Sequence, residues 1–237
     1  MALSANDGID LEDRIGLSVL PQGNAREIHS PLMSCSMMFG LALLQHFDYD
    51  EITELIEGMQ AHACRKVIEL SSLYDQAEQD TELDRNQEYK DWVLGGIEND
   101  SFTLDESARL CCQLAVVALY MKMELRIKKA CRIACKEVKA EQLYKMHYLE
   151  KELKRRGIKI RDLSHFSSFD ELRCINNDIK HGGVVGKELA KYPGWKLGDN
   201  LSNIDIAYER IAPGCRSFIF ELIQAMLDKK EENNVDG

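Results

Sequence analysis

Residues 103–138 read TLDESARLCCQLAVVALYMKMELRIKKACRIACKEV, a pattern typical of long α-helix. Thr103 and Glu106 have the spacing of a capping box, in which two side chains satisfy backbone N–H groups at a helix start. The apolar residues that follow recur every three or four positions, so we expect them to pack inward: Leu110, Leu114, Val117, Leu119, Tyr120, Leu125, Ile127, Ile133 and Val138. No glycine or proline follows before Gly157. One very long helix and two helices that meet near residues 136–140 are both compatible with this pattern. We favour two, because helices longer than about 25 residues are uncommon in globular proteins.

Helix signals recur on both sides of this stretch. Three more pairs have the composition of helix starts: Ser30–Pro31, Asp48–Glu51 and Ser168–Glu171. Residues 32–47 are apolar on several faces but too short to cross a membrane, which favours a buried central helix. Residues 79–100 are polar and contain paired glycines at 95–96, which favours a connection between helices. A last helix is expected over about residues 205–230.

No segment alternates as a β-strand would. The sequence therefore predicts an all-α protein, a bundle of about five to seven helices. We expect a flexible arm over residues 1–25, a single helical domain over 26–230 and a disordered tail over 231–237.

The composition limits the classes of function. The formal net charge of −10 argues against a surface that binds nucleic acid by bulk charge, although residues 151–161 are locally basic. No apolar run approaches the roughly 20 residues that span a bilayer, and no secretory signal is visible. We therefore expect a soluble cytoplasmic protein with no membrane association. The eight cysteines are expected to be free thiols, mostly small buried residues.

No cofactor or metal is expected. The chain has no GxxxxGK[ST], GxGxxG, HExxH or GxSxG motif, which would indicate nucleotide binding, a zinc site or a serine nucleophile. Cys131 and Cys135 are one helical turn apart, but no CxxC pair or suitably spaced histidine accompanies them. His29, His46, His62 and His165 are isolated, and we interpret them as surface or satisfied core residues.

Residues 170–183, DELRCINNDIKHGG, stand out. On a helix that ends at the paired glycines, the apolar residues Leu172, Ile175 and Ile179 form an inward stripe. Arg173, Asn177 and His181 are four residues apart and align on a second stripe, with Asn176 and Lys180 in the row beside it. Adjacent asparagines destabilise a helix by roughly 1 kcal/mol relative to better helix formers. A cost of this size indicates a functional role for these polar residues.

Two interpretations of this polar cluster are open. It can be a network that braces the helix end, with His181 capping carbonyl groups. It can instead be a site for a phosphate or an RNA backbone. In that case His181 exchanges protons near neutral pH, and Arg173 and Lys180 hold the phosphate charge. Asn176 and Asn177 then orient a hydroxyl group or a ribose.

A late helix with a polar residue, four intervening residues and then a histidine resembles the motif of the HEPN superfamily. The likeness covers residues 168–200, and in this sequence Asn176 stands where the family has arginine, with Arg173 one turn earlier. The resemblance implies an all-α homodimer in which two such motifs face each other. It also implies a metal-independent endoribonuclease of a defence or toxin–antitoxin system.

Two hypotheses follow. In the first, which the polar stripe favours, the protein is an endoribonuclease with His181, Arg173 and Asn177 as catalytic residues and with Asn176 and Lys180 binding RNA phosphate. In the second, it is a non-catalytic helical subunit that dimerises and binds RNA or a protein partner, which the acidic charge and the asparagine at 176 favour. A homodimer is expected in either case, because residues 32–47 and the helix from 104 carry more apolar surface than one thin bundle needs.

Overall fold

The structure, a computed structural model, describes residues 31–135 and 138–235. These residues form six α-helices: α1 (Pro31–Gln45), α2 (Asp50–Gln79), α3 (Gln87–Ala134), α4 (Met146–Lys154), α5 (Phe166–Lys180) and α6 (Ile204–Val235). Within those ranges the only β pairing is one isolated bridge between Val184 and Asn200. The predicted all-α class is confirmed.

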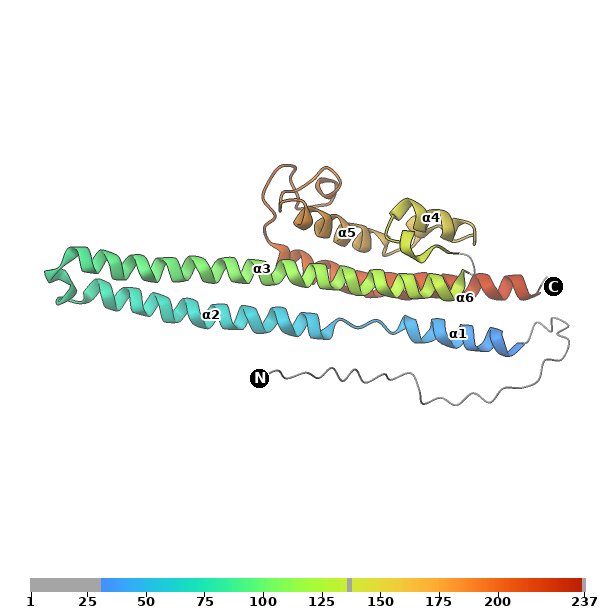
Figure 1. Cartoon of the computed structure of the whole chain (residues 1–237), viewed down its shortest axis with the longest axis horizontal. Coiled ribbons are helices and arrows are strands. Elements are labelled where there is room, and N and C mark those ends of the chain that lie inside the picture. Colours follow the sequence, from blue (N-terminus) through green and yellow to red (C-terminus); the bar gives the residue numbers. More distant parts are fainter. Residues whose placement is uncertain (1–30, 136–137, 236–237) are drawn as a thin grey trace, which may run out of the picture.

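The molecule is built along α3 (Figure 1). This helix has 48 residues and is therefore about 72 Å long at 1.5 Å per residue. α1 and α2 follow one another along one side of α3, and the chain reverses direction at residues 80–86. α6 packs against α1, α3 and α5, and α5 and α4 lie on the side of α3 away from α2.

The core lies where α3, α5 and α6 meet. The rings of Phe169 and Phe218 stack with their centres 4.7 Å apart, and Tyr120 stacks on Phe169 at 6.3 Å. Gly214 lets α6 approach α5 closely, because a Cβ at that position would lie 2.8 Å from the Cβ of Ser168. This packing fixes the position of α5, the helix that carries the candidate residues.

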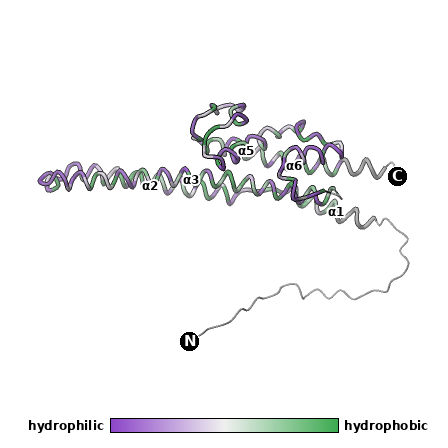
Figure 2. Tube along the Cα trace, turned by 45° about the horizontal axis from the view of Figure 1, so that its top comes forward, coloured by the Kyte–Doolittle hydropathy of each residue, from purple (hydrophilic) through white to green (hydrophobic). Residues whose placement is uncertain are grey.

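The α2–α3 hairpin projects beyond this core as an arm of two helices. Residues 91–110 of α3 contain no buried residue, and α2 buries only Ile56 and Ala77. Near the end of the arm the Lys90 ammonium donates to the Glu78 carbonyl and to Asp84 Oδ1, both at 2.8 Å. The far end of the arm is largely hydrophilic (Figure 2). Among the described helices, the arm therefore has no third layer to cover its apolar residues.

The expected helix starts at Asp48, Thr103 and Ser168 are wrong. α2 begins at Asp50 without a side-chain cap, and the carboxylate of Asp48 binds Lys122 of α3 instead. Thr103 lies inside α3, and α5 begins at Phe166. Residue 30 lies outside the described residues. A four-residue pattern is compatible with a helix interior as well as with a helix start, so it does not locate the end of an element.

Two expectations about the chain between α2 and α4 have different outcomes. A connection does lie within the range expected for it, residues 79–100, but it is shorter: α2 ends at Gln79, and α3 begins at Gln87 and continues through Gly95 and Gly96. The break expected after the long helix is confirmed, since α3 ends at Ala134 and α4 begins at Met146.

The inward packing expected for α3 is only partly right. Leu119, Tyr120 and Ile127 are buried, but Leu110, Leu114 and Leu125 are exposed. The neighbouring helices cover only the other faces of α3. The spacing of apolar residues therefore identified an apolar surface, but it could not show whether another helix covers that surface.

The ends of the chain also differ from expectation. α1 is peripheral rather than central, since Leu41 is buried while Phe39 and Leu43 are exposed. α6 continues to Val235, past residue 231 where the tail was expected to begin. The arm expected at residues 1–25 lies outside the described residues. None of the described helices is long and apolar enough to cross a membrane.

Candidate functional site

All five candidate residues lie on α5 or directly after it. The helix ends at Lys180 with His181 as its C-cap residue. Gly182 and Gly183 follow with φ of 109° and 71°, a conformation that favours glycine. The Gly183 N–H donates to the Asp178 carbonyl at 2.9 Å. The predicted glycine stop is confirmed.

The segment after α5 is held by backbone hydrogen bonds. The Val185 N–H donates to the Asp199 carbonyl at 2.9 Å, and the Leu201 N–H donates to the Gly183 carbonyl at 2.8 Å. The Asp178 carboxylate accepts from the Gly186 N–H at 2.7 Å. His181 therefore lies at the base of an ordered loop.

Glu171 joins this loop and α6 to α5. Its side chain is only 3% exposed and accepts from Trp195 Nε1 at 2.7 Å and from both terminal nitrogens of Arg210 at 2.8 and 2.6 Å. A buried carboxylate needs such pairing. Sequence reasoning assigned Glu171 to a helix cap and missed this role, because both partners are distant in sequence.

Arg173 is held by a neighbour on its own helix. Asp170 Oδ1 accepts from Arg173 Nε at 2.8 Å and lies 2.7 Å from Nη2. The other carboxylate oxygen of Asp170 accepts from the Tyr192 hydroxyl at 2.7 Å. Burial and this hydrogen bond raise the pKa of Tyr192, so the hydroxyl stays protonated and remains a donor. The pairing with Asp170 thus holds the guanidinium of Arg173 more than two helical turns before His181.

Asn176 is buried. Its side chain is 1% exposed, and neither its Oδ1 nor its Nδ2 has a hydrogen-bond partner among the described residues. The expectation that Asn176 faces a ligand beside Lys180 is therefore not met. Lys180 is exposed, with its ammonium 5.9 Å from the centre of the Tyr120 ring.

His181 is exposed, as expected. Asn177 is half-buried, and its backbone carbonyl accepts from the His181 N–H at 3.0 Å. Over the described part of the chain, no side-chain hydrogen bond joins Arg173, Asn177 and His181. The predicted stripe thus places an accessible histidine at one end and an engaged arginine at the other.

A separate pocket of about 720 Å³ lies where the end of α1 and the starts of α2 and α5 meet α6. There His165 Nδ1 lies 2.7 Å from Glu221 Oε1, and the His165 N–H donates to Oε2 at 3.2 Å. Burial raises the pKa of Glu221, but the hydrogen bonds from His165 outweigh this effect and leave it below the usual 4.5. No local pattern indicates this pair, because its members are 56 residues apart. Among the described residues, no nucleophile donates to the His165 ring, so the pair fastens α5 to α6.

The described residues contain no cluster of metal-binding side chains. Five of the seven cysteines whose surroundings are described are buried, as the sequence suggested. No family model, curated protein or solved structure matches this chain. Fold and site together define an all-α protein with a projecting two-helix arm and an exposed histidine after α5.

Proposed function

We propose that this protein is a non-catalytic, HEPN-like helical subunit of the cytoplasm that acts by binding other macromolecules. The observation that carries the proposal is that, among the described residues, neither motif position offers a free guanidinium to His181. The position that holds arginine in the family motif is the buried Asn176, and Arg173 is engaged by Asp170.

RNA cleavage requires more than an accessible histidine. A positioned acid or base contributes about 10²–10⁴-fold to a rate, but the charged phosphorane also needs donors aimed at it. The cation next to His181 is Lys180, whose ammonium lies over the ring of Tyr120. One lysine at an exposed helix end is a weak substitute for a preorganised site.

The charge of the chain supports a protein rather than RNA as the partner. The formal net charge is −10, which repels a polyanion over distances of about 10 Å at moderate salt. Lys180 and Lys187 are exposed near His181, but Glu188 is exposed beside them.

The second candidate is a metal-independent endoribonuclease. The exposure of His181 favours it, because an acid–base histidine must reach its substrate. This function would require Arg173 to leave Asp170 when RNA binds.

The test is incubation of the purified chain with single-stranded and structured RNA in the presence of a chelator, beside the His181→Ala variant. We expect both proteins to leave the RNA intact. Cleavage by the wild type that is lost in His181→Ala would select the second candidate, whereas cleavage that persists in the variant would indicate a contaminating nuclease.

A further inference from the structure

The outward face of α3 carries an uncovered row of large apolar side chains. Leu110, Leu114, Met121 and Leu125 are 52%, 56%, 53% and 56% exposed. Positions four and seven apart lie on the same side of a helix, so these four side chains form one stripe. Val117 and Ala118 lie between its two halves. We call Leu110–Leu125 the α3 stripe.

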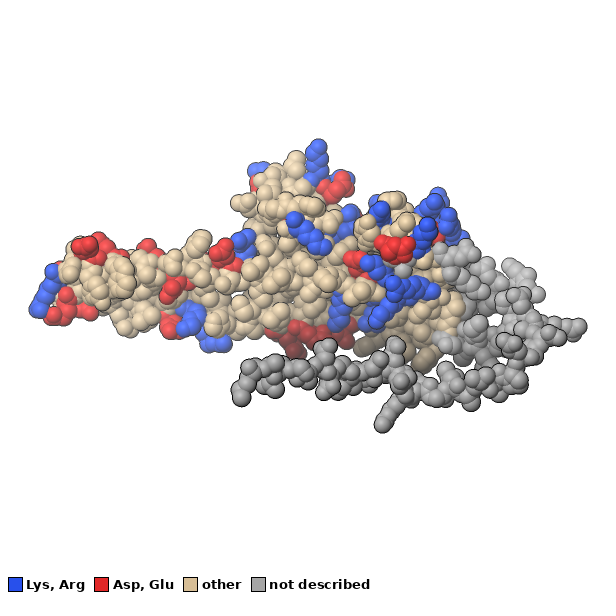
Figure 3. Space-filling view, viewed as in Figure 1, with Lys and Arg blue, Asp and Glu red and all other residues tan. Residues whose placement is uncertain are grey.

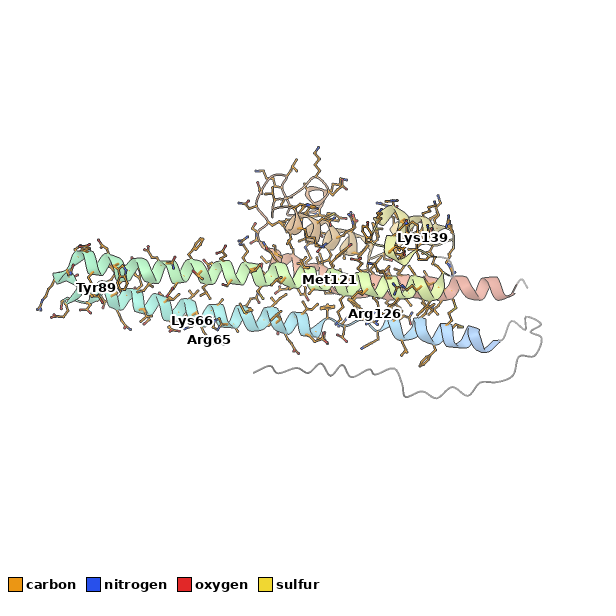
Figure 4. All side chains as sticks on the ribbon, viewed as in Figure 1. Arg65, Lys66, Tyr89, Met121, Arg126 and Lys139 are labelled. Atoms are coloured by element: carbon orange, nitrogen blue, oxygen red, sulfur yellow. The ribbon has the colours of Figure 1, made fainter. Side chains whose placement is uncertain are left out.

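Met121, one member of the stripe, is labelled in Figure 4, and Figure 3 shows the molecule from the same side. The middle of the molecule in Figure 3 is largely free of charged side chains, and lysine and arginine gather further along α3. Figure 4 labels Met121 in the carboxyl-terminal half of α3 and Arg126 further toward the end of that helix. Soluble monomers rarely leave such contiguous apolar surface exposed without an interaction that uses it.

The spacing of the α3 stripe is the same in both directions. Its four members are separated by four, seven and four residues. If a second α3 runs antiparallel, one register places Leu110 opposite the partner's Leu125 and Leu114 opposite the partner's Met121. The same register brings Val117 opposite the partner's Ala118. One alignment thus satisfies every apolar position, which is the self-complementarity that a two-fold interface requires.

The charges at the two ends of the α3 stripe are also complementary. Residues 98–106 contain four acidic residues and no basic one, and residues 126–132 contain four basic residues and no acidic one. In the antiparallel register, Glu106 lies beside the partner's Lys128 and the partner's Lys129. A parallel pair would place like charges together, which is unfavourable. Stabilisation of the helix dipole does not explain the acidic end, because that effect falls off within the first turn and α3 begins at Gln87.

We propose that the α3 stripe is a docking surface for a second copy of this chain, in an antiparallel pair with its two-fold axis between Val117 and Ala118. The proposed function is the binding of other macromolecules, and a second copy of the chain would be one such partner. The inference therefore rests on the proposed function. The paired segment, residues 106–129, is about 36 Å long. A single helix pair of this length gives an interface near the lower end of specific interfaces, about 1,200 Å² in total, so we expect a reversible dimer.

The test is sedimentation equilibrium of the full chain over a range of concentrations. We expect the wild type to be in monomer–dimer equilibrium and Leu114→Glu to weaken dimerisation by at least about tenfold, as expected for a central interface residue. Ile206→Glu is the matched control, because Ile206 is 61% exposed on α6 and glutamate suits the first turn of a helix. It should dimerise as the wild type does. Circular dichroism checks that each variant keeps its helical content.

Charge reversal tests the register. Glu106→Lys and Lys129→Glu should each weaken the dimer by about fivefold, since the two-fold axis repeats each contact. The double variant should recover most of the loss. A monomeric wild type, or a Leu114→Glu variant as dimeric as the wild type, would overturn the inference. Neither result bears on RNA cleavage, and RNA cleavage would overturn the proposed function without affecting the dimer.

Discussion

Replacing Asn176 by leucine should stabilise the protein. Asparagine and leucine have similar branched shapes, so Asn176→Leu exchanges two polar atoms for methyl groups with little overpacking. Each buried donor or acceptor left without a partner costs about 1–3 kcal/mol, and Asn176 has one of each. Repacking a filled core costs about 1–3 kcal/mol in the opposite direction. We therefore expect a net gain of about 1–2 kcal/mol in the free energy of unfolding.

Urea unfolding measures this gain as a higher midpoint with an unchanged slope. Asn177→Leu is the neighbouring control and should change stability by no more than about 0.5 kcal/mol, because Asn177 is half-buried and its side chain makes no hydrogen bond within the described residues. Asn176→Asp should be strongly destabilised by a buried charge. If Asn176→Leu instead loses more than about 1 kcal/mol, the amide has a partner, and its burial no longer argues against a role in ligand binding.

Two further variants test the contacts around α5. Arg210→Ala should lower the free energy of unfolding by about 3 kcal/mol, since it leaves the buried Glu171 carboxylate without a cation and with the Trp195 N–H as its remaining donor; near-wild-type stability in urea would show that this pair does not hold α5 to α6. Because the pKa of Glu221 in the folded chain lies below the usual 4.5, its pairing with His165 contributes stability that is complete above that pH and is lost as the pH falls through the folded pKa. Wild type should therefore lose stability more steeply on acidification than Glu221→Gln, and parallel stability–pH curves would contradict this assignment.

The fold class was predictable because it depends on local properties. Apolar residues at helical spacing, few prolines and the paired glycines after α5 each act within a few residues. Helix starts were not predictable, because pairs such as Thr103–Glu106 occur inside helices as well. The side-chain cap that the structure contains on α3 is Asn86, which accepts from the Tyr89 N–H at 3.2 Å.

The candidate site was predictable only in part, because burial depends on neighbours that the sequence does not place. The exposure of His181 followed from its position after the last helical turn. Asn176 was assigned to the solvent side by its polarity, but its side chain is buried. The bidentate pairing of Glu171 with Arg210 spans 39 residues, and no local pattern signals it. The same limit applies to Leu114, since periodicity does not show whether a helix or solvent lies opposite.

Disulfide trapping of Ala118→Cys tests most directly whether this protein acts by association through α3. In the antiparallel register, the two copies of residue 118 lie beside the two-fold axis, the place on α3 where the Cβ atoms of the two copies can come nearest to the roughly 3.5–4.5 Å that a disulfide needs. The background replaces Cys35 and Cys64 by serine, and Gly96→Cys on the arm is the control far from the axis. We predict that mild oxidation converts Ala118→Cys, but not Gly96→Cys, to a covalent dimer of unchanged helical content. Failure of Ala118→Cys to cross-link at concentrations where the chain is dimeric would contradict the proposed interface.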